Sequence, residues 1–215
     1  MGSRMLLVDF DGVVLRNKRC VRYQCDQSAR FVQKVTGMSL RASEQINKHW
    51  YPRHGHTVTM LNNMFDNVTT LEEYNSFVFD RQTMAAEIHD ADFDAQTHEQ
   101  FGNIMNLIDK CNKADISTAI FTNACLSWVS YCSMKIDPRL LQKVQVIYPT
   151  RMNQMKPNCL AYDNVELLFP NKEEFWFVDD TKGNLLEPSK RDNWIPLYYT
   201  ARTTVRDMQD HFGLL

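Results

Sequence analysis

The sequence predicts an α/β fold, in which a central parallel sheet is flanked by helices and a helical segment is inserted after the first strand. Two observations predict this fold. From residue 94 onward, short apolar stretches of strand length alternate with stretches of helical periodicity. Residues 25–84, by contrast, show helical periodicity without a convincing strand. Strands separated by helices of this length pair in parallel through right-handed crossovers, which places helices on both faces of the sheet.

The expected elements follow in order along the chain. An apolar run that ends at Asp9 is the first strand, and Thr70–Glu73 has the spacing of a capping box that begins one of the short helices of the insert. A long amphipathic helix is expected from residue 94. It is followed by expected strands at 116–122, 144–148, 174–178 and 194–198, and by expected helices at 126–134, 157–168 and 203–212.

Length and composition are typical of a globular protein with one core domain and a smaller insert. The 215 residues are 44% apolar and 23% charged, and the net charge of −2 gives no basic footprint of the kind that general nucleic-acid binding needs. We find neither an apolar run near 18 residues nor a secretory leader, so we expect a cytoplasmic protein without a membrane span. The six cysteines form no C-x-x-C pair, and we expect reduced, mostly buried thiols.

Polar side chains gather where four of the expected apolar stretches end. They are Asp9 and Asp11 in VDFDG, Thr122 and Asn123 in IFTN, Lys156 in MKPN, and Asp179, Asp180 and Asn184 in FVDDTKGN. In open α/β sheets, ligands bind at the carboxyl ends of the strands. Carboxylates that are crowded or buried there need a cation or a proton to compensate their charge. Each cluster alone is also typical of an ordinary turn or helix cap, so the clusters taken singly leave both interpretations open.

In their order and context, these four clusters resemble motifs one to four of the haloacid dehalogenase-like hydrolase superfamily. The resemblance implies a Rossmann-like core at residues 1–16 and 91–215 and a helical cap at residues 17–90. The position of the insert resembles subfamily I of that superfamily. The segment HWYPRHGHTVTML, with FTNA and FVDDTKGNL, is most similar to the pyrimidine 5′-nucleotidase-like group. That group carries a Tyr-x-x-Tyr-Gly-like stretch here, of which Tyr51 and Gly55 are kept, whereas His54 replaces the second tyrosine.

The resemblance also implies a catalytic role for each motif. Asp9 would be the nucleophile that attacks phosphorus, and Asp11 would be the general acid and then the general base. Thr122, the backbone N–H of Asn123 and Lys156 would bind the phosphoryl group.

The same resemblance implies a Mg²⁺ site at the ends of the strands. Its ligands would be the carboxylates of Asp9 and Asp180 and the backbone carbonyl of Asp11, with Asp179 bound directly or through water. The position of Asn184 often holds an acidic residue in the superfamily. In the expected cap, Arg53, His54 and His56 are candidates for contact with a second anionic or polar part of the substrate, although solvated loop side chains are the other interpretation.

The resemblance therefore implies a Mg²⁺-dependent phosphatase that hydrolyses a small soluble phosphomonoester through an aspartyl-phosphate. Nucleoside monophosphates and sugar phosphates are the candidate substrates, and we expect a monomer or a homodimer. The presence of Asp11 disfavours dehalogenase chemistry, which uses a lone aspartate. Two alternatives stay open: a phosphomutase of the β-phosphoglucomutase type, and a catalytically idle protein that binds a partner or a ligand through the same fold. The second would be expected to have lost Asp9, Asp11 or Lys156, and all three are present.

Overall fold

The chain divides into two units, which the computed structural model describes over residues 3–214, apart from the side chains of residues 52 and 53. The sheet unit is formed by the chain up to Arg16, by Phe93–Pro149 and by the chain from Asn153 onward. The helical unit is formed by Asn17–Asp92 together with Thr150–Met152. The insert was expected at residues 17–90, so the helical unit extends two residues further and takes in three residues from a later loop.

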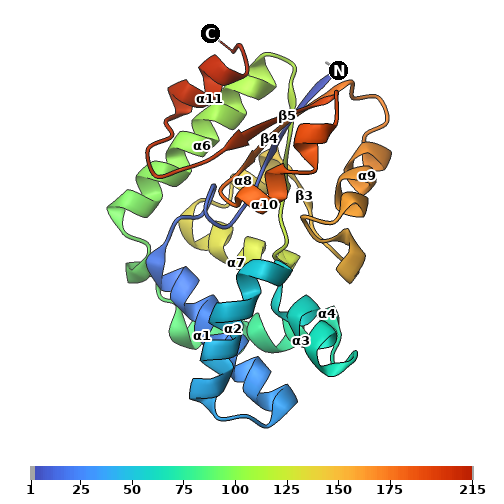
Figure 1. Ribbon diagram of the computed structural model, residues 1–215. Helices are drawn as coiled ribbons and strands as arrows, with labels where there is room; N and C mark the ends of the chain where they lie inside the picture. Colours follow the sequence, from blue (N-terminus) through green and yellow to red (C-terminus); the bar gives the residue numbers. More distant parts are fainter. Residues whose placement is uncertain (1–2, 215) are drawn as a thin grey trace. The chain divides into compact units, whose positions relative to one another are not determined.

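The sheet consists of five parallel strands in the order β3-β2-β1-β4-β5 (Figure 1). They are β1 (Arg4–Val8), β2 (Ser117–Phe121), β3 (Gln145–Ile147), β4 (Glu174–Asp179) and β5 (Trp194–Tyr198). The central strand β1 pairs with β2 and β4, with Val8 opposite both Ile120 and Val178. The carboxyl ends of these three strands therefore meet at one edge of the sheet.

Apolar side chains cover both faces of the sheet, which is why its strands read as nearly continuous apolar runs. On one face, Met5 and Leu7 lie in a core cluster with Phe177 of β4 and with Tyr162 and Val165 of the helix at Cys159–Leu168. On the other face, the ring of Trp176 stacks on Phe212, with 4.8 Å between the ring centroids. The fold is therefore a Rossmann-like α/β fold with helices on both sides of a parallel sheet, as predicted.

The helices of the sheet unit lie between its strands along the chain, except for the last helix, which follows β5. They are α6 (Ala95–Lys113), α7 (Leu126–Ile136), α8 (Leu140–Lys143), α9 (Cys159–Leu168), α10 (Lys182–Leu185) and α11 (Val205–His211). In Figure 1, α6 and α11 lie side by side on one side of the sheet and α9 lies on the other. The helix that was expected from residue 157 begins at Cys159, because the Asn158 side chain accepts a hydrogen bond from Leu160 N and so caps the first turn.

The helical unit contains five α-helices and packs around aromatic side chains. The helices are α1 (Lys18–Thr36), α2 (Leu40–His54), α3 (Thr57–Phe65), α4 (Leu71–Val78) and α5 (Arg81–Glu87). The short 3₁₀ helices of the two units are η1 (Asp90–Asp92), η2 (Met152–Gln154) and η3 (Pro188–Lys190). Phe31 of α1 packs edge-on against Tyr74 of α4, with 5.3 Å between the ring centroids. The expected capping box is confirmed, because the Thr70 and Glu73 side chains each accept a hydrogen bond from the other's backbone N–H.

Two further expectations concern the cysteines and membrane spans. All six cysteines are free thiols, and four of them are buried, as expected. Within residues 3–214, every helix is either too short or too polar to cross a bilayer.

Candidate active site

Asp9 follows the last residue of the central strand and is almost completely buried. Its backbone N–H continues the sheet by donating to Val178 O at 2.9 Å, and its side-chain Oδ1 accepts from Phe10 N at 2.7 Å. Only 7% of the residue is exposed. The strand end therefore fixes this carboxylate at the edge where β1 meets β4.

The chain turns sharply after Asp9 and brings Asp11 toward α7. Leu15 N donates to Phe10 O at 2.7 Å, and Gly12 N donates to Leu15 O at 2.8 Å, which closes the turn. The side chain of Asp11 then accepts a hydrogen bond from the indole N–H of Trp128, with 2.9 Å between Nε1 and Oδ1.

Gly12 is required by both the backbone and the space beside it. Its φ of 89° lies in the left-handed region that favours glycine. A Cβ at this position would lie 2.0 Å from Oδ2 of Asp180. The Asp180 carboxylate, which follows β4, therefore lies directly against the turn that follows β1, and any side chain at position 12 would displace it.

Lys156 is the buried cation of this cluster. Its ammonium group donates to Asp179 Oδ2 at 2.6 Å and to the backbone carbonyl of Phe121 at 2.8 Å, and it lies 3.1 Å from Asp9 Oδ1. The group also lies 5.1 Å from the ring centroids of Phe121 and Phe177. With 2% of the residue exposed, the charge is held almost entirely by protein groups.

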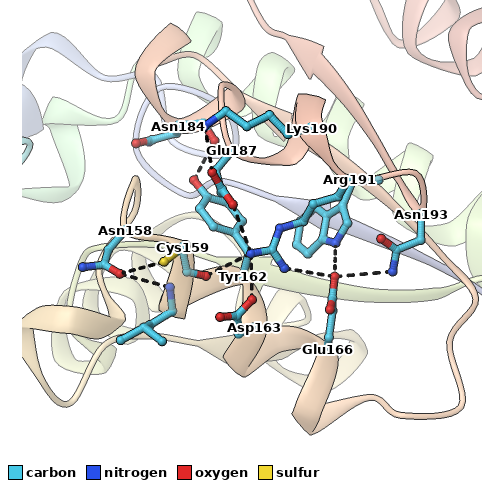
Figure 2. A network of polar contacts seen from close by, with 12 residues as sticks. Asn158, Cys159, Tyr162, Asp163, Glu166, Asn184, Glu187, Lys190, Arg191 and Asn193 are labelled. Carbon is cyan, nitrogen blue, oxygen red and sulfur yellow. Dashed lines mark hydrogen bonds and ion pairs between the residues drawn. The ribbon is translucent and has the colours of Figure 1, made fainter.

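Asp179 is fully buried, and donors approach both of its oxygens. Thr181 N donates to Oδ1 at 2.7 Å, and the Asn184 amide donates to Oδ1 at 3.2 Å and to Oδ2 at 3.0 Å. Asn184 is itself held through its backbone carbonyl, which accepts from the Tyr162 hydroxyl at 2.6 Å (Figure 2). Asp179 was expected to bind the metal directly or through water. These contacts favour a different role, in which Asp179 anchors Lys156 and Asn184, over direct binding of the metal.

Figure 2 shows that Tyr162 lies beside a larger polar network on α9 and η3. The guanidinium of Arg191 pairs with Asp163 at 2.7 Å and with Glu166 at 3.2 Å, and lies 5.7 Å from the centroid of the Tyr162 ring. The indole of Trp194 also donates to Glu166, at 2.7 Å. This network fixes α9 and therefore the hydroxyl that holds Asn184.

The loop after β2 places Thr122 and Asn123 beside Lys156. The side chain of Asn123 makes two hydrogen bonds of 2.8 Å to the Lys156 backbone, one accepted from its N–H and one donated to its carbonyl. The Thr122 hydroxyl oxygen accepts from Ala124 N at 3.0 Å, and its residue is 2% exposed. The strand ends thus bring the polar residues of all four sequence clusters into one unit of the protein.

Burial and the neighbouring carboxylates together determine the pKa values of the site. Burial raises the pKa of Asp9 well above its usual range; Lys156 opposes this effect, and Asp179 adds to it. Burial and the neighbouring Asp179 likewise raise the pKa of Asp180. Burial alone would lower the pKa of Lys156, but Asp179 and Asp9 more than offset it and raise the pKa. One ammonium group therefore does not balance the carboxylates around it.

The carboxylate oxygens fit a divalent cation. One oxygen each of Asp9, Asp179 and Asp180 lies within 4.8 Å of the others. Hard carboxylate oxygens are the ligands that Mg²⁺ prefers, and a divalent ion would supply the positive charge that Lys156 alone does not. Asp9 and Asp180 could each hold the ion through Oδ2, because protein donors reach Oδ1 of these two residues but both oxygens of Asp179.

The three specificity candidates lie in the helical unit. The side chain of Arg53 is outside the described residues. His54 ends α2, with its Nδ1 3.2 Å from Asn63 Nδ2. His56 is 7% exposed, and its Nδ1 accepts from Val58 N at 3.1 Å to cap α3. This position favours a structural role for His56 over the expected contact with substrate, because the ring is used inside the unit.

Sequence reasoning missed two residues that support the site, Trp128 and Tyr162. Both are completely buried aromatic residues on helices, and each uses its single polar atom toward the site. The available signal was their position: Trp128 lies six residues after Thr122, and Tyr162 lies six residues after Lys156. Buried Trp and Tyr usually find a hydrogen-bond partner, but the sequence does not say which one.

Comparisons with known proteins place this geometry in a structural context. No protein-family model matches the sequence, and no curated protein matches it. Solved structures do match. A hydrolase of the haloacid dehalogenase (HAD) superfamily from Ehrlichia chaffeensis is 13% identical over 100% of this chain and 98% of its own, with a TM-score of 0.51. A haloacid dehalogenase-like hydrolase from Burkholderia xenovorans LB400 is 13% identical over 92% and 84%, with a TM-score of 0.50.

A third solved structure is the archaeal β-phosphoglucomutase from Pyrococcus sp. strain ST 04, which is 14% identical over 94% of this chain and 89% of its own, with a TM-score of 0.49. At identities this low, the likeness to the two hydrolases shows that the chain has their fold. What the chain does has to be argued from its own residues.

Proposed function

We propose that the protein is a Mg²⁺-dependent phosphatase that hydrolyses a small phosphomonoester. One observation carries the proposal: carboxylates from the ends of β1 and β4 converge within 4.8 Å, and the buried ammonium group of Lys156 lies between two of them. Burying several carboxylates so close together costs free energy unless cations compensate their charge. A site that binds a divalent cation beside a nucleophilic carboxylate is suited to phosphoryl transfer.

The residues of the sheet unit have complementary roles in the proposed reaction. An oxygen of Asp9 forms a bond to phosphorus while the ester P–O bond breaks, and Asp11 donates a proton to the departing oxygen. In the second half, Asp11 takes a proton from a water molecule whose oxygen attacks phosphorus. The bond between Asp9 and phosphorus then breaks, which releases phosphate and restores the carboxylate of Asp9, while Asp11 is again protonated and ready to act as an acid.

Lys156 and the loop after β2 hold the transferring group. In the proposed reaction, the positive charge of Lys156, the Thr122 hydroxyl and the backbone N–H of Asn123 stabilise the negative phosphoryl oxygens; the contacts that join Lys156 to the loop after β2 support this role. When bound, Mg²⁺ supplies further positive charge to those oxygens. In this proposal Asp9, Asp180 and the backbone carbonyl of Asp11 hold the ion.

The substrate class and subgroup stay proposals from the sequence. Similarity to the pyrimidine 5′-nucleotidase-like group favours nucleoside monophosphates, and sugar phosphates are the other candidates. His54, at the position where that group has a tyrosine, is the residue of this segment that merits substitution first.

The test is a panel of phosphomonoesters, including p-nitrophenyl phosphate, assayed with Mg²⁺ and with EDTA. We expect phosphate release that needs the metal and that falls by at least about 100-fold in Asp9→Asn. Far-ultraviolet circular dichroism should be unchanged in this variant, because the substitution is isosteric. Hydrolysis by Asp9→Asn at the parental rate contradicts the proposal. Isomerised sugar phosphate in place of free phosphate would assign the alternative phosphomutase reaction.

A further inference from the structure

The hydrogen bond between Trp128 and Asp11 joins a core residue to a reacting group. Trp128 is 0% exposed and lies on α7, whose first residue follows the loop that carries Thr122. Its indole N–H donates to Oδ1 of Asp11 at 2.9 Å. The indole is a donor only, so it cannot exchange roles with the carboxyl group as a hydroxyl would.

This contact distinguishes the two oxygens of Asp11. A hydrogen-bond donor at Oδ1 favours the state in which Oδ1 is the carbonyl oxygen and the acidic proton is carried on Oδ2. The rigid indole, packed in the core, also fixes the plane of the carboxyl group. A general acid needs both features, because its proton has to point at the departing oxygen.

We propose that Trp128 is a positioning residue, which holds Asp11 so that Oδ2 delivers the proton to the leaving group. The inference rests on the proposed function, because it assigns a task to Asp11. In the first half of the reaction, the O–H bond at Oδ2 breaks and its proton passes to the departing oxygen, while the P–O ester bond breaks and the bond from Asp9 to phosphorus forms. In the second half, Oδ2 takes a proton from the attacking water.

A pair of substrates of nearly equal shape tests the proposal. Phenyl phosphate has a basic leaving group that needs a proton, whereas p-nitrophenyl phosphate has a leaving group that departs without one. In Trp128→Phe, we expect kcat/KM for phenyl phosphate to fall about tenfold and for p-nitrophenyl phosphate to fall less than about twofold. An equal loss for both substrates would overturn the proposal, because a general distortion of the site does not distinguish leaving groups.

Trp176 offers a matched control. Its residue is 1% exposed, and its indole N–H also donates to a carboxylate, Glu174 Oε1, at 2.6 Å. Glu174 begins β4, at the opposite end of the strand from Asp179. Trp176→Phe therefore removes a buried indole N–H from the core, as Trp128→Phe does. It should leave the ratio of kcat/KM for phenyl phosphate to kcat/KM for p-nitrophenyl phosphate unchanged. A ratio altered as much as in Trp128→Phe would contradict a specific role for Trp128.

A second measurement does not need the Trp128 variant to fold, and it does not need activity. The indole N–H resonances of the four tryptophans are recorded by ¹H–¹⁵N NMR in the parent and in Asp11→Asn, which removes the anionic acceptor but keeps the tryptophan. We expect one indole resonance to move upfield, while those of Trp176 and Trp194 stay in place. Four unmoved resonances would overturn the proposal. If the indole resonance differs between the parent and Asp11→Asn but the parent hydrolyses neither substrate, the proposed function is contradicted, whereas the contact between Trp128 and Asp11 is confirmed.

Discussion

The two units of the protein each bury a basic side chain, with opposite consequences for its charge. In the sheet unit, Lys156 is 2% exposed, but Asp179 and Asp9 lie within 3.1 Å of its ammonium group, and its pKa is raised. In the helical unit, His56 is 7% exposed, and its Nδ1 accepts a backbone hydrogen bond while its ring packs edge-on against Tyr74. Burial lowers the pKa of His56 to about 4.

The difference teaches how the same desolvation can either keep or remove a charge. Carboxylates stabilise the ammonium group of Lys156 enough to offset burial, and the same ammonium group allows two carboxylates to be buried beside it. The imidazole of His56 is used as a neutral acceptor, so burial favours the uncharged form. The sheet unit buries Lys156 together with carboxylates that keep it charged, whereas the helical unit buries His56 in its uncharged form.

Lys156→Met gives the largest expected effect, because it leaves Asp9 and Asp179 buried without their cation. We expect the free energy of unfolding to fall by about 3–5 kcal/mol and phosphatase activity to fall by at least about 100-fold. Urea unfolding and p-nitrophenyl phosphate hydrolysis measure the two effects. The control is Lys182→Met, which alters an exposed lysine of the same unit. Equal stability of the two variants would show that Lys156 does not balance the buried carboxylates.

The pH dependence of stability tests the other half of the comparison. The pKa of His56 is about 4 in the folded protein and near 6.5 when unfolded, so unfolding takes up a proton between these values. Its contribution to stability is therefore complete above pH 6.5 and is lost as the pH falls toward 4, by up to about 3 kcal/mol.

His56→Asn removes this titration and keeps a side chain that can cap α3. Thermal unfolding between pH 7 and pH 4 should be less sensitive to acid in this variant than in the parent. The exposed His49 supplies the control, and His49→Asn should follow the parental curve. If the parent and His56→Asn lose stability in parallel, His56 is not buried in its neutral form.

Asn123→Ala sharpens the comparison by loosening Lys156 without removing its charge. The change removes the two 2.8 Å hydrogen bonds to the Lys156 backbone. We expect a loss of about 2 kcal/mol in the free energy of unfolding and a loss of about tenfold in kcat. Chemical denaturation and steady-state kinetics measure these changes. Unaltered kcat would indicate that the ion pairs alone position the ammonium group.

Tyr162→Phe gives the smallest expected effect. It removes the hydroxyl that donates to the Asn184 carbonyl, while the ring keeps its packing (Figure 2). We expect a loss of about 1 kcal/mol in stability, because one buried acceptor loses its donor. The variant should bind Mg²⁺ slightly more weakly, because Asn184 holds Asp179. A matched change, Tyr198→Phe, alters a half-exposed tyrosine of β5 and should affect neither property. Equal effects of Tyr162→Phe and Tyr198→Phe would show that the Tyr162 hydroxyl does not support the site and that Tyr162 contributes only through packing.

The edge of the sheet was predictable from the sequence, because parallel strands end together whatever packs around them. Apolar runs that stop at Asp9 and Asp179 therefore sufficed to expect these carboxylates at one edge. The partner of Asp11 was not predictable, because it depends on how α7 is rotated against the turn after β1. The burial of His56 was not predictable for a similar reason: the segment that holds it is short, and its periodicity does not show which side is buried.

Binding of Mg²⁺ to Asp180→Asn tests the shared cation site most directly. The measurement is the rise in thermal stability with Mg²⁺ concentration for the parent, for Asp180→Asn and for Asp192→Asn, which changes an exposed aspartate of the same unit. We predict that Mg²⁺ stabilises the parent and Asp192→Asn equally and that Asp180→Asn responds at least about tenfold more weakly. The same stabilisation of all three proteins, or of none, would contradict a cation held between the ends of β1 and β4.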